Sequence, residues 1–145
     1  MIRPTYERGH DVDNEKAALN KFCQELDCNF ISLPKAARAD SILFRDGNAR
    51  IVVEVKVRKN ERLRYPTYMI SHHKYLALCN WADMGFVSVL LVQWTDDLGY
   101  VTVPVEHTVS VGGRYDRGDP KDIESVVHID IMKFSTADYD KCINP

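Results

Sequence analysis

A tight-turn signal between two runs of branched residues constrains the fold of this chain more than any other feature. The tripeptide Asp46-Gly47-Asn48 separates residues 40–45 from residues 50–57, and both runs are rich in side chains that favour strands. Every second side chain of the later run is aliphatic, namely Ile51, Val53, Val55 and Val57. Because side chains alternate between the two faces of a strand, the sequence predicts a β-hairpin with one aliphatic face.

The other face of this predicted hairpin carries charge. Alternation places Val52, Glu54 and Lys56 together, and Asp40 begins the partner strand. Two neighbouring carboxylates repel each other, so the pair makes sense if a cation lies between them, and Mg²⁺ or Mn²⁺ prefers such oxygen ligands. The ammonium group of Lys56 would lie within reach of a water or a phosphate. A solvated face is the common role of a Glu and a Lys at this spacing, but the aliphatic opposite face and the upstream Asp40 favour a site.

The register of the hairpin depends on the length of its loop. A three-residue loop centred on Gly47 gives the cross-strand pairs Asp40 with Glu54, Ile42 with Val52, and Phe44 with Arg50. A two-residue loop shifts the pairing by one residue and places Asp40 opposite Val53. The meeting of the two carboxylates is therefore a hypothesis about register.

Patterns elsewhere in the chain predict further strands and two helices. Asp13 or Asn14 can cap a first helix, and Ser71 or Thr67 can open a second one that ends near Gly85. Strands are expected at residues 30–33, 86–94, 100–103 and 126–131. This order predicts an α/β or α+β fold in which helices pack on a mixed sheet.

The chain length fits one domain over residues 1–145. We expect its core over about residues 13–103 and a β-rich C-terminal extension over about 104–145. Residues 1–12 are expected to form an arm, and a glycine-rich loop to run from Gly112 to about Pro120. We assign this loop no role in the site, since a surface turn explains it equally well.

Composition excludes several classes of protein. The formal net charge of −2 and the 28% of charged residues are ordinary for a globular chain and do not indicate a polycationic arm. The four cysteines form no CxxC pair, which argues against a zinc site or a disulfide framework. The longest apolar run, at residues 87–92, is too short to span a bilayer, and the first residues lack a signal-peptide pattern. We therefore expect a cytoplasmic protein without membrane contact.

The charged hairpin resembles a known nuclease signature. Ala39-Asp40, thirteen intervening residues and Glu54-Val55-Lys56 look like the D…(D/E)xK motif of the PD-(D/E)xK, or restriction-endonuclease-like, superfamily. The flanking helices match that superfamily's αβββαβ core, and the resemblance spans roughly residues 13–94. The nearest likeness is to small nucleases of phage and prophage type, and more loosely to resolvase-like members. Ala39 stands where the motif usually has proline.

The resemblance implies a divalent-metal-dependent endonuclease that hydrolyses phosphodiester bonds of DNA. Asp40, Glu54 and the backbone carbonyl of Val55 would bind Mg²⁺ or Mn²⁺, and Lys56 would orient the attacking water. Many members carry a further acid on the first helix, and Glu15 is the candidate here. Acids are also favoured in a first helical turn by the helix dipole alone, so this position has an equally good structural explanation.

Basic residues beyond the motif are candidates for binding nucleic acid. Arg58, Lys59, Arg62 and Arg64 follow Lys56 closely along the chain and could track a phosphate backbone, although a charge run is usually a solvated face. His73 and Lys74 lie at the start of the second helix, where exposed amides suit a phosphate, and the resemblance implies that Lys74 assists Lys56. Tyr65 and Tyr68 could stack on bases, although packing is the more common role of tyrosine.

Two other readings of the sequence stay open. The chain could be a non-catalytic module that binds nucleic acid or another protein on a nuclease-like fold. It could also be a metal-free structural subunit whose charged face makes an oligomer contact. Related enzymes frequently pair because cutting two strands needs two centres, so a homodimer is one assembly to expect.

Overall fold

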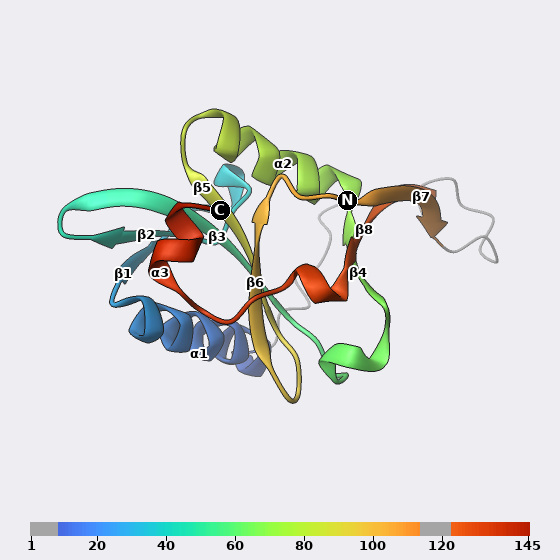
Figure 1. Ribbon diagram of the computed structural model, residues 1–145, viewed down its shortest axis with the longest axis horizontal. Coiled ribbons are helices and arrows are strands. Elements are labelled where there is room, and N and C mark those ends of the chain that lie inside the picture. Colours follow the sequence, from blue (N-terminus) through green and yellow to red (C-terminus); the bar gives the residue numbers. More distant parts are fainter. Residues whose placement is uncertain (1–8, 114–122) are drawn as a thin grey trace.

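The computed structural model describes residues 9–113 and 123–145 (Figure 1). Its helices and strands are α1 (Gly9–Leu26), β1 (Asn29–Ser32), β2 (Ser41–Arg45), β3 (Asn48–Val57), β4 (Thr67–Ser71), α2 (His72–Asp83), β5 (Val87–Gln93), β6 (Leu98–Val103), β7 (Thr108–Gly113), β8 (Ile123–Asp130) and α3 (Tyr139–Ile143). Short 3₁₀ helices lie between them, among them η1 (Lys35–Ala37), η2 (Arg62–Arg64) and η5 (Ile131–Lys133). Most of the predicted glycine-rich loop and residues 1–8 of the predicted arm lie outside the described residues.

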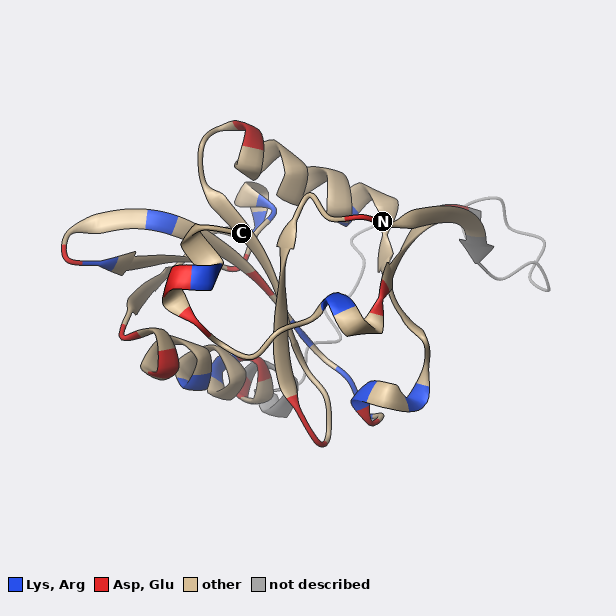
Figure 2. Ribbon diagram, viewed as in Figure 1, with Lys and Arg blue, Asp and Glu red and all other residues tan. Residues whose placement is uncertain are grey.

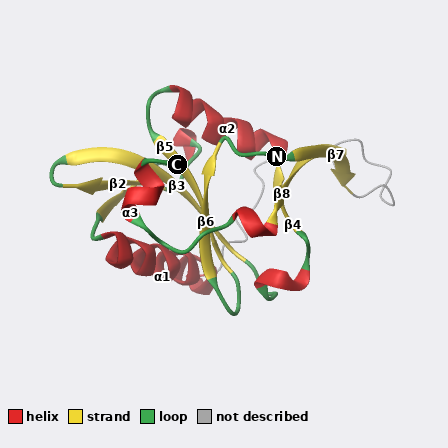
Figure 3. Ribbon diagram, viewed as in Figure 1, coloured by secondary structure: helices red, strands yellow, loops and turns green. Residues whose placement is uncertain are grey.

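A five-stranded mixed sheet forms the centre of the molecule, in the order β1-β2-β3-β5-β6. Strands β3 and β5 pair in parallel, whereas the other neighbours pair antiparallel. Parallel partners need a crossover connection, and the segment that contains α2 provides it. Figure 3 shows helices on both sides of these strands. The predicted fold class, helices packed on a mixed sheet, is confirmed.

Each face of this sheet has its own hydrophobic core. On one face, Phe22 of α1 packs with Ile51, Val53 and Val55 of β3. On the opposite face, α2 and a second sheet pack against Leu90 and its alternating neighbours on β5. Figure 1 shows α1 and α2 on opposite sides of the strands. Because Glu54 pairs with Leu90 and Lys56 with Val92, the charged residues of β3 face the α2 side.

The second sheet was not predicted in full. It has three antiparallel strands in the order β4-β8-β7. Strand β4 covers residues that we expected only to open the second helix, and it pairs Tyr68 with Ile129 and Ile70 with Val127. The short run at residues 67–71 has its partner far along the chain, so local pattern did not reveal it. The small helix α3 was likewise not predicted.

The hairpin of β2 and β3 combines the two registers that the sequence left open. Asp46 and Gly47 form a two-residue turn with positive φ angles of 52° and 79°. Arg45 therefore pairs with Asn48 and Phe44 with Ala49, which makes the expected pairing of Phe44 with Arg50 wrong. An irregularity between Leu43 and Phe44 then inserts one extra residue into β3. Beyond this bulge, Ile42 pairs with Val52 as predicted.

Two helix starts differ in how well the sequence predicted them. The first helix begins at Gly9, so Asp13 and Asn14 lie inside α1 and do not cap it. Ser71 is the N-cap of α2, because its hydroxyl accepts a hydrogen bond of 3.2 Å from the N–H of Lys74. Among the described residues, no helix is both long enough and apolar enough to cross a membrane.

Candidate active site

Four charged side chains meet on the α2 side of the sheet. Glu54 is 7% exposed, and its Oε1 atom lies 3.4 Å from the Nζ atom of Lys56. The same oxygen lies 3.5 Å from the Nζ atom of Lys74, a residue of the first turn of α2. Asp40 completes the group, because the β2–β3 ladder ends with Ser41 opposite Val53 and the next residues are Asp40 and Glu54. The three residues of the predicted motif therefore lie together.

Asp40 is fixed at the end of β2 by hydrogen bonds to its neighbours. Its N–H donates to the carbonyl of Val53 at 3.0 Å, and its carbonyl accepts from the N–H of Leu33 at 2.8 Å. Its Oδ2 atom accepts a short hydrogen bond of 2.6 Å from the N–H of Val55. The Asp40 side chain therefore lies against the backbone of β3 at Val55, between the motif residues Glu54 and Lys56 in sequence.

The electrostatics of the site are dominated by burial. Burial raises the pKa of Glu54, and the neighbouring charge of Asp40 raises it further, while Lys56 and Lys74 oppose both effects. Burial also lowers the pKa of Lys56, and the adjacent Lys74 acts in the same direction. The site therefore holds a carboxylate and an ammonium that are both harder to ionise than in water.

A cavity of about 330 Å³ opens over these groups. Asp40, Glu54 and Lys74 line it, together with His73 beside them on α2. His73 and Lys74 were both predicted to contact the substrate, and the structure brings both to the cavity.

Two further basic residues line this cavity that sequence reasoning did not single out. Lys35 and Arg38 belong to the η1 segment just before Asp40. Trp81 of α2 holds this segment in place, since its indole N–H donates to the carbonyl of Ala37 at 2.9 Å. The signal available in the sequence was the basic spacing Lys35-Ala36-Ala37-Arg38 immediately upstream of the motif.

The basic segment after β3 divides into residues with different surroundings. Figure 2 shows basic residues gathered along the end of β3 and η2. Lys59 and Arg64 are exposed, as a phosphate contact requires. Arg58 is half-buried, and its Nη2 atom donates a hydrogen bond of 2.6 Å to the hydroxyl of Tyr68.

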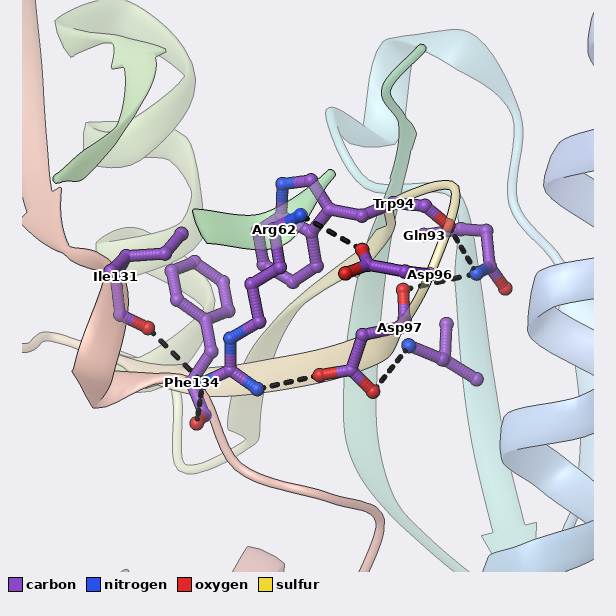
Figure 4. Close-up of polar contacts among 8 residues, drawn as sticks. Arg62, Gln93, Trp94, Asp96, Asp97, Ile131 and Phe134 are labelled. Atoms are coloured by element: carbon purple, nitrogen blue, oxygen red, sulfur yellow. Dashed lines mark hydrogen bonds and ion pairs between the residues drawn. The ribbon is translucent and has the colours of Figure 1, made fainter. Parts of the chain in front are cut away.

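Arg62 makes several contacts within the protein, and its predicted contact with a phosphate stays a prediction. Figure 4 shows its guanidinium between partners from two segments, the β5–β6 turn and η5 with its C-cap Phe134. Nη1 lies 2.6 Å from Oδ2 of Asp97, and Nη2 donates to the carbonyls of Phe134 at 2.7 Å and Ile131 at 3.2 Å. The backbone N–H of Arg62 also donates to Asp96. Because these bonds occupy the head of the side chain, Arg62 ties η2 to the β5–β6 turn and to η5.

Glu15 lies on α1, which packs on the face of the sheet opposite to Glu54. It is half-buried. Within residues 9–113 and 123–145, no three His, Cys, Asp or Glu side chains are grouped closely enough to share a metal ion. The structure thus gathers Asp40 with Glu54 but does not add Glu15 to them, and a catalytic role for Glu15 stays a prediction.

Comparisons with known proteins agree with this geometry. No curated protein matches the sequence. Among solved structures, the chain resembles Hjc, a Holliday junction resolvase from the archaeal hyperthermophile Archaeoglobus fulgidus, with a TM-score of 0.56, 14% sequence identity and coverage of 84% of each chain. At that identity the likeness shows the fold alone, which is the predicted restriction-endonuclease-like one. The family described as "Phage putative PDDEXK endonuclease" matches residues 1–137, and this chain therefore belongs to that phage PDDEXK endonuclease family.

Proposed function

We propose that this chain is a divalent-metal-dependent endonuclease that hydrolyses phosphodiester bonds of DNA. The observation that supports this most strongly is the meeting of Asp40, Glu54 and Lys56 beside the cavity that Asp40 and Glu54 line. A phosphodiester carries a negative charge that repels an attacking oxygen, so its hydrolysis needs positive charge and a positioned water. Carboxylates that hold a cation, beside an ammonium group, meet both needs.

The residues present fit a hard cation such as Mg²⁺ or Mn²⁺. Asp40 and Glu54 offer carboxylate oxygens, and a cation beside them would relieve the cost of holding the buried charge of Glu54. The carbonyl of Val55 is a third candidate ligand. The N–H of Val55 donates to Oδ2 of Asp40. Because the N–H and C=O groups of one strand residue point toward the same edge of the strand, the Val55 carbonyl also points toward the Asp40 side of β3. When bound, the cation supplies electrophilic charge that offsets the charge developing on a scissile phosphate.

Lys56 and Lys74 would handle the water and the phosphate. Lys56 lies beside Glu54 with a lowered pKa, so it can exchange a proton more readily than an ordinary lysine. Lys74 contacts the same oxygen of Glu54 and is more exposed, with 49% of its side chain accessible. We assign Lys56 to orienting the water and Lys74 to supporting Lys56 and contacting the phosphate.

Basic residues around the cavity would hold the rest of the DNA strand. Lys35, Arg38 and His73 line the cavity and can contact the scissile phosphate or its neighbours. Lys59 and Arg64 are exposed beyond the end of β3 and would contact phosphates further along. Since the cavity residues and the residues beyond β3 lie on either side of Glu54, the bound DNA strand would cross the edge of β3.

A cleavage assay with matched variants tests the proposal. The full chain is incubated with plasmid DNA, linear duplex DNA and single-stranded RNA, with Mg²⁺, with Mn²⁺ or with a chelator. Asp40→Asn and Lys56→Ala are compared with Lys21→Ala, which changes an exposed lysine on α1. We expect metal-dependent cutting of DNA that both site variants abolish and Lys21→Ala retains. DNA binding without cutting would instead support a non-catalytic module, and neither binding nor cutting would favour a structural subunit.

A further inference from the structure

A second cavity opens at the point where β3 leaves the sheet. It has a volume of about 480 Å³, within the usual range for ligand sites, and is lined from η2, β4 and β8 as well as from Arg58. Arg58 follows Glu54 and Lys56 in the alternation of β3, two residues beyond Lys56. Since a strand rises by about 3.3 Å per residue, the backbone of Arg58 lies roughly 7 Å from that of Lys56.

The floor of the cavity is aromatic and rigid. Tyr68 and Trp94 are 4% and 2% exposed, and their rings meet edge to face with centroids 6.3 Å apart. Phe134 packs against both rings, at 5.7 Å from Tyr68 and 5.2 Å from Trp94. The guanidinium of Arg58 lies 4.8 Å from the centre of the Tyr68 ring. Arg58 and Arg62 lie over the Tyr68 and Trp94 rings, so these rings form the base of the cavity, and the exposed ring of Tyr65 offers a face on which a flat ligand could stack.

The rim of the cavity combines apolar surface with hydrogen-bonding groups. Tyr65 and Met69 line it and are 56% and 57% exposed, so both hold apolar surface in water. Asn60, Thr67 and His128 also line it. The ring nitrogens of His128 lie within hydrogen-bond distance of Thr67 and Ser110, so the amide of Asn60 and the hydroxyl of Thr67 are the groups that can bond to a ligand. The Tyr65 ring, the amide and hydroxyl groups and an arginine together match three features that a nucleotide presents, namely a base face, a base edge and a phosphate.

We infer that this cavity, which we name the base pocket, receives one unpaired base of DNA adjacent to the phosphate held at the active site. The inference rests on the proposed function, because the active site places the phosphate from which the base extends. A base inside a continuous duplex is stacked on both faces and paired along its edge, so it must leave the helix to enter a pocket. The preferred substrate is therefore DNA with an unpaired nucleotide near the cut, such as a bulge, flap or branch, and continuous duplex is a poor substrate.

Binding measurements test the base pocket separately from cleavage. The full chain carrying Lys56→Ala is titrated with three labelled DNAs in the presence of Ca²⁺: a continuous duplex, the same duplex with a one-nucleotide bulge, and that bulge made abasic. Tyr65→Ala is added to this background to remove the stacking ring. Tyr65→Phe keeps the ring, and Leu63→Ala changes a neighbouring side chain that is 71% exposed and outside the pocket lining.

We expect Tyr65→Ala to weaken binding of the bulged DNA about tenfold, as loss of one base–aromatic stack does. It should leave the affinity for the duplex and for the abasic bulge unchanged, and Tyr65→Phe and Leu63→Ala should bind all three DNAs like their parent. An equal loss on all three DNAs, or no loss on the bulge, overturns the base pocket.

Cleavage by the wild-type chain in parallel separates this inference from the proposed function. Metal-dependent cutting without any preference for the bulge overturns the base pocket alone. Selective binding of the bulge without cutting overturns the nuclease and leaves the base pocket standing. Absence of both cutting and DNA binding overturns the two together.

Discussion

Glu54 is the residue at which the charges of the candidate site meet. One of its oxygens contacts both Lys56 and Lys74, while Asp40 lies on the adjoining strand end. The two lysines beside this carboxylate differ in their exposure to solvent. The side chain of Lys56 is 22% exposed, and that of Lys74 is 49% exposed. In the proposed reaction the more enclosed Lys56 would orient the water, and the outer Lys74 would contact the substrate phosphate.

Replacing Lys74 tests this division of roles. We expect Lys74→Ala to lower the cleavage rate by roughly 10- to 100-fold, because one cation near the developing charge is lost while Lys56 remains. The rate is measured under single-turnover conditions with DNA in saturating metal. Lys21→Ala serves as the control, since it removes the same charge from the exposed surface of α1. Equal rates for the two variants would show that Lys74 takes no part in the reaction.

Arg62 should contribute to stability more than to substrate binding. Arg62→Ala leaves Asp97 without its partner and the carbonyls of Ile131 and Phe134 without their donor, so it should cost about 2–3 kcal/mol of unfolding free energy. Lysine cannot bridge these acceptors with a planar fork, and Arg62→Lys should restore little. Urea unfolding measures both variants. The exposed Arg64 is the matched control, and Arg64→Ala should stay within about 0.5 kcal/mol of the wild type.

At the scale of elements, short-range sequence patterns predicted the strands and helices that carry the motif residues. The hairpin, the first helix and the helix capped by Ser71 were all recognised from alternation, turn residues and caps. The bulge in β3 was not recognised, because the turn length and the register beyond Leu43 obey different constraints. Its effect is to combine a favourable two-residue turn with the pairing that brings Asp40 level with Glu54.

The cap of α2 has an effect that can be measured at this scale. Ser71→Ala should cost about 1 kcal/mol of unfolding free energy, because the N–H of Lys74 loses its acceptor. Ser71→Thr keeps a hydroxyl and should recover most of this loss. Thermal or urea unfolding gives the values, with Ser32→Ala at the exposed end of β1 as the control. A loss in Ser32→Ala as large as that in Ser71→Ala would contradict the capping role.

At the scale of the whole molecule, two hydrophobic cores lie on opposite faces of the central sheet. The C-terminal part of the chain contributes to both, since Cys142 of α3 packs into the α1 core while Val127 and Ile129 of β8 pack into the α2 core. Residues on both sides of position 103 share this packing, because Val103 lies in the same core as Val127 and Ile129 of β8. The extension forms part of the wall of the base pocket and holds Arg62.

Buried thiols in the α1 core should make the fold sensitive to alkali. Burial raises the pKa of Cys23 and of Cys142 from the ordinary value of 9.0 to about 12. A group whose pKa is higher in the folded state contributes its stability fully below its unfolded pKa and loses it as the pH rises through the folded value. The free energy of unfolding should therefore fall between about pH 9 and pH 12.

Urea unfolding across this pH range checks the expectation. Cys142→Ala should lower stability at neutral pH by leaving a cavity, yet show a shallower decline toward high pH because one titrating thiol is gone. The same slope in Cys142→Ala and in the wild type would mean that this thiol does not cause the alkaline loss.

The sequence alone determined the hairpin, its aliphatic face and the presence of Glu54 and Lys56 on the opposite face. Those features depend on alternation and turn chemistry over a few neighbouring residues, which any extended chain must obey. Only the tertiary structure decided that Lys35 and Arg38 line the cavity of the candidate site, that Arg62 binds the β5–β6 turn and η5, and that β4 pairs with β8. These outcomes depend on contacts between segments far apart in the chain, and such contacts form only once the two cores have packed against the sheet.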